Sequence, residues 1–124
     1  MPLEHRKIDF SNAELQAAMV SYCLRHSIHL PDAFIAGIDL QWQPKLEATF
    51  RFSDFDDSNR AIILNEPEIA ASLIEYCHAQ NMPLPHHADK VLEPSDRDGV
   101  AMLIRMSWGD LRRMKNNSVK ASNA

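Results

Sequence analysis

The sequence is poor in glycine, in cysteine and in long apolar runs. Its three glycines, Gly37, Gly99 and Gly109, are too scattered to form a glycine-rich loop that cradles phosphate. Two cysteines give little reason to expect disulfide bonds, and no apolar run approaches the roughly 18 residues that a membrane-spanning helix needs. We therefore expect neither a phosphate-binding loop protein nor a membrane protein.

The chain also lacks an excess of positive charge, with 13 lysines and arginines against 17 acidic residues. The formal net charge is -4, so the chain lacks the basic field that non-specific binding to nucleic acid or to anionic membranes requires. The start, Met1 to Lys7, has no apolar signal core after its charged residues, and this favours a cytoplasmic location. The polar, aperiodic residues 115–124 are expected to form a disordered tail.

A pattern of residues recurs after a shift of 54 positions. Identical dipeptides mark it: Tyr22-Cys23 with Tyr76-Cys77, and Leu30-Pro31 with Leu84-Pro85. Residues 6–59 align with residues 60–113 without a gap, which predicts a tandem duplication. Because one unit of this size would be only marginally stable, residues 1–114 are expected to form a single pseudo-symmetric domain with a shared core.

Each unit begins with a short apolar stretch and a helix start signal. The stretches at residues 8–10 and 62–64 are candidate strands. The start signal is a capping box, formed by Ser11 with Glu14 in one unit and by Asn65 with Glu68 in the other. Apolar residues at helical spacing then predict helices from about Asn12 to Ser27 and from about Glu66 to Asn81.

Apolar and polar residues alternate with a period of two after each predicted helix. This predicts one hairpin over residues 38–53 and a second over residues 90–107, with its tight turn at Asp98-Gly99. Ala101 and Leu103 are expected on the outward face, where Leu103 interrupts a polar row. The predicted fold is α+β, a two-layer sandwich with two helices on one face of an antiparallel sheet of four to six strands.

Cysteine and histidine are the candidate metal ligands. Cys23 and Cys77 lie on the buried stripe of the predicted helices, which favours small apolar groups over ligands or a disulfide. The three-residue spacing of Cys23, His26 and His29 is the best metal candidate. The corresponding positions of the second unit are Cys77, Gln80 and Pro83, so a metal site common to both units is excluded. A looser set includes His86 and His87.

Two arginines occupy equivalent positions on the predicted strands. Arg51 and Arg105 either form a symmetric pair of anion contacts or make cross-strand pairs with carboxylates such as Asp39. The sequence has no nucleophile flanked by small residues and no carboxylate pair that the pattern places across a cleft. We therefore expect no enzymatic activity and no cofactor.

Three functions remain open from the sequence. The first is a non-enzymatic cytoplasmic protein-interaction or regulatory module, binding a protein partner or a second copy through Leu103 and through a loop with Phe34 and Ile35. The second is a small-ligand or metal-binding domain that uses histidines and the cleft between the units. The third is weak nucleic-acid binding through the basic segment from Arg112 to Lys115.

Overall fold

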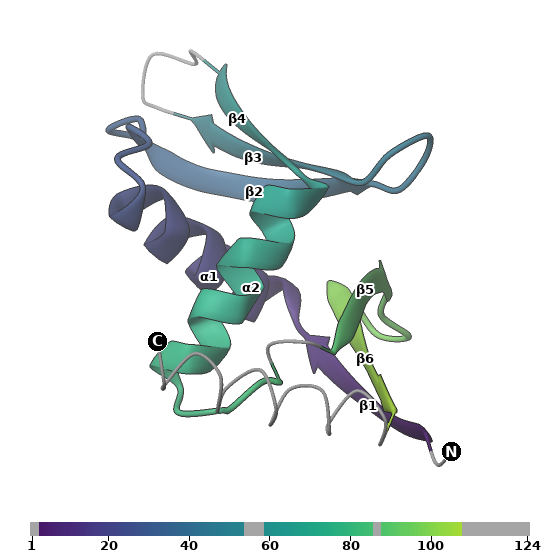
Figure 1. The fold of residues 1–124 in the computed structure, drawn as a ribbon. Coiled ribbons are helices and arrows are strands. Elements are labelled where there is room, and N and C mark those ends of the chain that lie inside the picture. The colour runs from purple at the N-terminus through teal and green to yellow at the C-terminus, as the bar shows by residue number, and fades with distance from the viewer. Residues whose placement is uncertain (1–2, 54–58, 86–87, 108–124) are drawn as a thin grey trace.

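A computed structural model describes residues 3–53, 59–85 and 88–107 as six strands and two helices (Figure 1). The elements, in chain order, are β1 (Leu3–Phe10), α1 (Asn12–Arg25), β2 (Phe34–Gln41), β3 (Glu47–Ser53), β4 (Asn59–Asn65), α2 (Glu66–Ala79), β5 (Asp89–Pro94) and β6 (Val100–Ser107). The predicted α+β class is confirmed. In the described part of the chain, no helix has the length and apolar character needed to cross a membrane.

Both helices begin with the capping box that the sequence predicts. The Ser11 hydroxyl accepts from the Glu14 amide at 3.2 Å, and the Ser11 amide donates to the Glu14 carboxylate at 3.1 Å. Asn65 and Glu68 make the same reciprocal pair, with both distances at 3.0 Å. An N-cap side chain of this type is worth about 1 kcal/mol. Both glutamates therefore have a structural role.

Both helices end in the same way, two residues earlier than predicted. Ser27 and Asn81 each adopt a positive φ of 58°, which takes the chain out of the helix. The Ile28 amide donates to the Cys23 carbonyl, five residues earlier in the chain. The Met82 amide donates to the Cys77 carbonyl in the same way. This is the Schellman arrangement, which satisfies carbonyls of the last helical turn.

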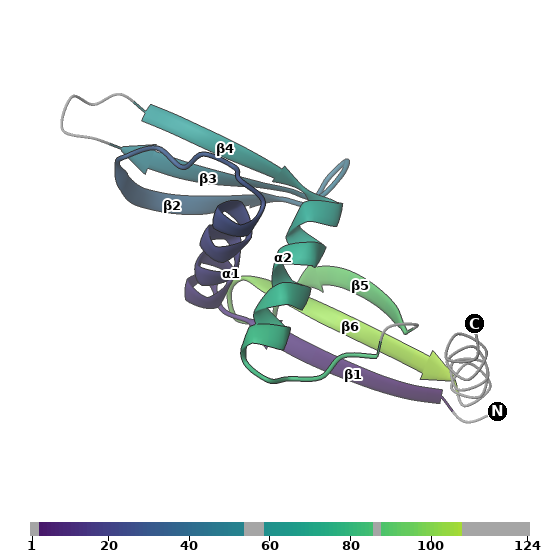
Figure 2. The same cartoon turned by 60° about the vertical axis from the view of Figure 1, so that its left-hand side comes forward.

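The strands form two separate three-stranded sheets. Sheet A has the order β1-β6-β5 and sheet B the order β2-β3-β4, and every pair is antiparallel. Figures 1 and 2 show sheet B on one side of the helix pair and sheet A on the other. The prediction of a single sheet covered by two helices on one face is thus corrected to a sheet, a helix pair and a second sheet.

The leading strands pair with one side of each hairpin. The stretches predicted at residues 8–10 and 62–64 are strands, but they extend to Leu3–Phe10 and Asn59–Asn65. β1 pairs with β6 along its whole length, and β4 pairs with β3 in the same way. Since both sides of β3 and β6 are then hydrogen-bonded, neither strand remains open for the other hairpin.

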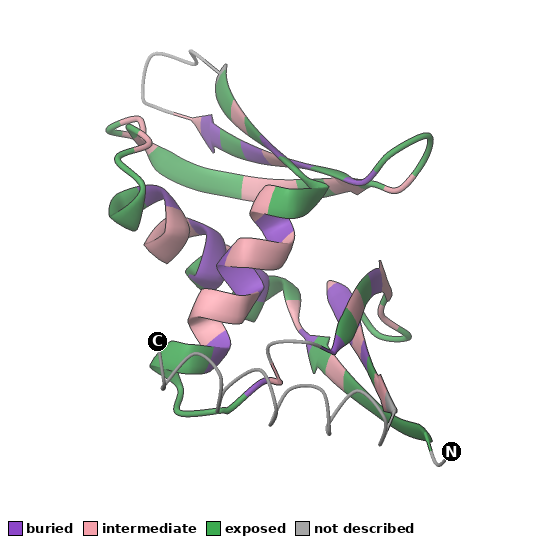
Figure 3. Ribbon diagram, in the orientation of Figure 1, coloured by how far each residue is buried: buried purple, intermediate pink, exposed green. Residues whose placement is uncertain are grey.

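Each sheet takes strands from both halves of the chain. The order βαββ occurs twice, and the first strand of each half completes the sheet of the other half's hairpin. One apolar cluster includes residues of both helices and both sheets, as the buried segments in Figure 3 indicate. An origin of this order by tandem duplication stays a prediction.

Burial along the strands follows the predicted alternation, with one exception. Phe50 and Met102 are fully buried on the inner faces of sheets B and A. The exception is Ala101, which was predicted on the exposed outer face but is fully buried. It pairs across the sheet with Asp9 and Glu93, and a methyl group is too short to reach solvent between these longer side chains.

Candidate functional site

The apolar residues predicted as one contact surface lie on different sheets. Phe34 and Ile35 begin strand β2 of sheet B and do not lie in a loop as predicted. Leu103 lies on β6 of sheet A, where it is only half-exposed between Lys7 and Val91. Because the helix pair lies between the sheets, these residues do not form one continuous surface.

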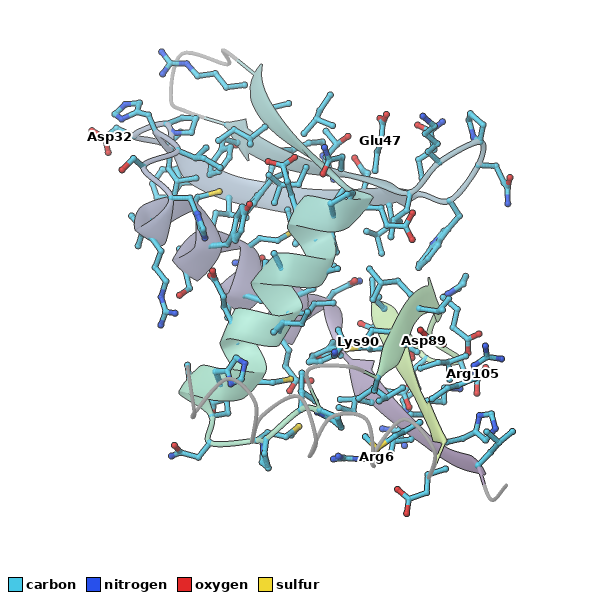
Figure 4. All side chains as sticks on the ribbon, in the orientation of Figure 1. Arg6, Asp32, Glu47, Asp89, Lys90 and Arg105 are labelled. Atoms are coloured by element: carbon cyan, nitrogen blue, oxygen red, sulfur yellow. The ribbon has the colours of Figure 1, made fainter. Side chains whose placement is uncertain are left out.

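Arg51 and Arg105 each have a carboxylate neighbour. The Arg51 Nε lies 2.6 Å from the Asp39 carboxylate, on the exposed face of sheet B. Arg105 pairs across sheet A with Asp89, 3.9 Å between charged atoms, and Figure 4 shows these two side chains next to each other. The geometry matches cross-strand pairing of exposed charges, which is worth less than about 1 kcal/mol.

The two thiols are enclosed by the core. Cys23 and Cys77 are both free and buried, as the sequence predicts. Burial raises the pKa of each thiol above its ordinary value, and nearby Glu68 raises the pKa of Cys23 further. At neutral pH both groups are therefore protonated, whereas a nucleophilic or metal-binding cysteine has to be a thiolate.

The metal candidate Cys23, His26 and His29 is not assembled as a ligand set. The His26 Nε2 lies 2.8 Å from the Glu75 carboxylate, and its ring packs on Tyr22 with centroids 4.2 Å apart. Among residues 3–53, 59–85 and 88–107, no group of three metal-ligating side chains comes together. His86 and His87 lie outside the described residues, as do the basic segment from Arg112 to Lys115 and the predicted tail.

A cavity of about 330 Å³ lies beside β1, between the first strand of one half and the helix of the other. Its walls come from β1, from the start of α1 and from the end of α2 with the loop that follows: Ile8, Asp9, Phe10, Glu14, Tyr76, Cys77, Gln80 and Met82. Phe10 and Tyr76 meet edge-to-face with centroids 6.4 Å apart. The cavity is largely apolar, and no basic residue among those described lines it.

The four edge strands differ in how they are protected from pairing with another chain. An edge strand exposes a row of free amide and carbonyl groups, and proteins block such rows with charges, prolines or irregular pairing. β1 carries charges along its length, and β5 has only six residues and ends at Pro94. β2 has an irregularity between Ile35 and Gly37, and the Arg51–Asp39 pair lies on its outer face.

β4 has none of these protections in its central part. From Ala61 to Asn65 it contains no charge and no proline, and its pairing with β3 is regular from end to end. The Ile63 side chain is 59% exposed on the outer face of sheet B. In Figure 2, β4 forms the margin of this sheet, and no other described element runs along its free side.

Ile63 was not identified as a site residue from the sequence, although a signal was present. The stretch that corresponds to it in the first unit, from Lys7 to Phe10, alternates polar and apolar residues, whereas residues 61–64 are all apolar. In the alignment of the two units, Ile63 corresponds to Asp9. An apolar residue at a position that is charged in the first unit is thus the signal that the sequence offered.

Three comparisons with known proteins give no further guidance. No protein-family model, curated protein or solved structure matches the chain. The functional inference therefore rests on β4 and on the cavity beside β1.

Proposed function

We propose that the protein is a non-enzymatic interaction module that binds an extended polypeptide strand along the free edge of β4. The unprotected β4 edge is the observation that carries this proposal. A cytoplasmic location, which the sequence favours, is part of the same proposal.

Strand addition suits this edge for two physical reasons. The free amide and carbonyl groups of β4 supply hydrogen bonds to any added backbone, and the exposed Ile63 side chain supplies an apolar contact that selects among partners. An uncharged, β-branched edge without a partner also promotes aggregation. A specific partner strand would therefore both use and protect β4.

Peptides selected from a random decapeptide library are expected to bind through β4. The Ile63→Lys variant should lose at least about tenfold in affinity for them, because an edge lysine opposes strand addition and the apolar contact is removed. Affinity is measured by fluorescence polarisation with labelled peptides.

Val91→Lys is the matched control, since Val91 is an exposed aliphatic residue, at 52%, on the edge strand β5 of the other sheet. This variant should bind the selected peptides as the parent protein does. Peptides that bind Ile63→Lys and the parent protein equally well would refute strand addition at β4.

The cavity beside β1 supports a second function, the binding of a small molecule. Its volume lies at the lower end of the range for ligand sites. Apolar walls together with two acidic residues, Asp9 and Glu14, and without a described basic residue, favour an apolar ligand that carries an amine. Phe10 and Tyr76 add aromatic rings, which attract cations.

Phenethylamine at millimolar concentration is expected to raise the melting temperature if this cavity binds such amines. Glu14→Gln should reduce the shift, because the amide retains the capping box but removes one of the two negative charges that line the cavity. Glu68→Gln makes the same change in the capping box of α2, outside the cavity, and should leave the shift intact. An equal shift in both variants would exclude Glu14 as the amine contact.

A further inference from the structure

We infer that the cavity beside β1 receives the chain's own segment from Leu111 to Lys115, and that basic side chains of this segment contact Asp9 and Glu14. This inference rests on the second proposed function, because it names a group, both cationic and apolar, that the cavity takes. A small amine then has to displace the segment. The segment lies outside the described residues, and its sequence and the place where β6 ends indicate its destination.

The end of β6 lies within reach of the cavity. β6 ends at Ser107, which pairs with Leu3 at the start of β1. The part of β1 that lines the cavity, from Ile8 to Phe10, lies five to seven positions further along this strand, which is roughly 17–24 Å. Lys115 follows Ser107 by eight residues, and eight extended residues span at most about 26–29 Å. The segment can therefore reach the cavity without any change in the described fold.

The segment and the cavity carry opposite charges. The segment contains Arg112, Arg113 and Lys115 and no acidic residue. The charged residues that line the cavity are Asp9 and Glu14. Complementary charges of this kind favour association and select among possible occupants.

Both carboxylates are able to accept a cation. Asp9 and Glu14 are exposed, and each accepts a hydrogen bond from an uncharged group, a serine hydroxyl at 2.8 Å and a backbone amide at 3.1 Å. In the described part of the chain, neither carboxylate has an ion-pair partner. Lys7, on the same face of β1 as Asp9, makes its ion pairs with Glu93 and Asp96.

The apolar residues of the segment suit the remaining walls of the cavity. Leu111 and Met114 flank the two arginines in the sequence, and the cavity is largely apolar. Removing such side chains from water adds to the attraction between the charges. Residues 116–124, by contrast, offer Lys120 as their single basic residue and Val119 as their single large apolar residue. The part of the chain from Leu111 to Lys115 is therefore the better occupant.

A thermodynamic cycle on the full chain tests the contact. The cavity variant combines Asp9→Asn with Glu14→Gln, and the segment variant combines Arg112→Gln, Arg113→Gln and Lys115→Gln. Each variant should lower the melting temperature by about 2–4 °C, the scale of an exposed charge contact. All five substitutions together should lower it no further than either variant alone, because both variants remove the same contact.

Asp89→Asn with Glu68→Gln is the matched control, since these two acidic residues lie outside the cavity. The effect of this control should add to that of the segment variant. A cavity variant that is equally additive would refute the contact. Coupling that weakens on dilution would assign the segment to a second copy of the chain and overturn a contact within one chain.

Phenethylamine distinguishes the failure of this inference from the failure of the proposed cavity function. The amine should raise the melting temperature at least about twice as much in the segment variant as in the parent protein, because it no longer has to displace the segment. Equal shifts would overturn the segment as occupant and leave amine binding intact. No shift in either protein would overturn amine binding, and an additive cycle in addition would overturn both.

Discussion

Replacing Gly99 by alanine is expected to lower the free energy of unfolding by about 3 kcal/mol, from left-handed strain together with overpacking. Gly99 lies in the turn between β5 and β6 with a φ of 78°. A Cβ at this position would collide with the Phe10 carbonyl oxygen and lie 2.9 Å from the Ser11 carbonyl carbon. These are backbone atoms at the start of α1, so the collision cannot be relieved by rotating a side chain.

Gly37→Ala is the matched control in the other sheet. Gly37 does not have a positive φ, and a Cβ there would meet only the guanidinium group of Arg51, with Nη2 at 2.7 Å and Cζ at 3.5 Å. That atom ends a half-exposed side chain, which can move at the cost of its exposed contact with Asp39. The loss of stability should therefore stay below about 1 kcal/mol.

Thermal unfolding followed by circular dichroism measures both glycine variants. At about 4 °C per kcal/mol, the melting temperature should fall by roughly 12 °C for Gly99→Ala and by a few degrees at most for Gly37→Ala. Equal shifts would show that the β5–β6 turn does not pack tightly against the start of α1.

Replacing Leu15 by alanine is expected to cost about 2–5 kcal/mol, the range for a buried leucine whose removal leaves a cavity. Leu15 is fully buried in α1, in the cluster that both helices and both sheets share. A cavity at this position weakens the packing of both sheets, so unfolding should remain a single transition at a lower urea concentration.

Leu24→Ala makes the same chemical change in the same helix, where the side chain is 69% exposed. Leucine and alanine have similar helix propensities, so the change in stability should be within about 0.5 kcal/mol of zero. Urea unfolding of both variants, followed by far-ultraviolet circular dichroism, compares them directly. If Leu24→Ala proves as costly as Leu15→Ala, the packed face of α1 has been assigned incorrectly.

The candidate β4 site shows how far the sequence leads toward function. The sequence shows residues 62–64 as an apolar stretch, and an apolar residue in an outward polar row predicts an interaction surface. The residue predicted from the sequence was Leu103, which the structure places half-exposed between Lys7 and Val91. The more exposed residue, Ile63, was not predicted. Exposure depends on which strand lies at an edge, and no single strand's own residues contain that information.

Local chemistry is sufficient to specify the helices, their capping boxes and the turn at Gly99. Each of these depends on residues within a few positions of one another, such as Ser11 with Glu14, so their signals can be read along the chain. The alternation of apolar residues likewise specifies which face of β3 and β6 is buried.

Only the folded chain decides which strands become neighbours. β1 pairs with β6 across almost the whole length of the chain, and this choice divides six strands into two sheets and leaves β4 at an edge. Backbone amide and carbonyl groups are the same in every strand, so strand pairing is determined by how the helices and sheets bury their apolar faces together. The β4 edge is a result of that packing.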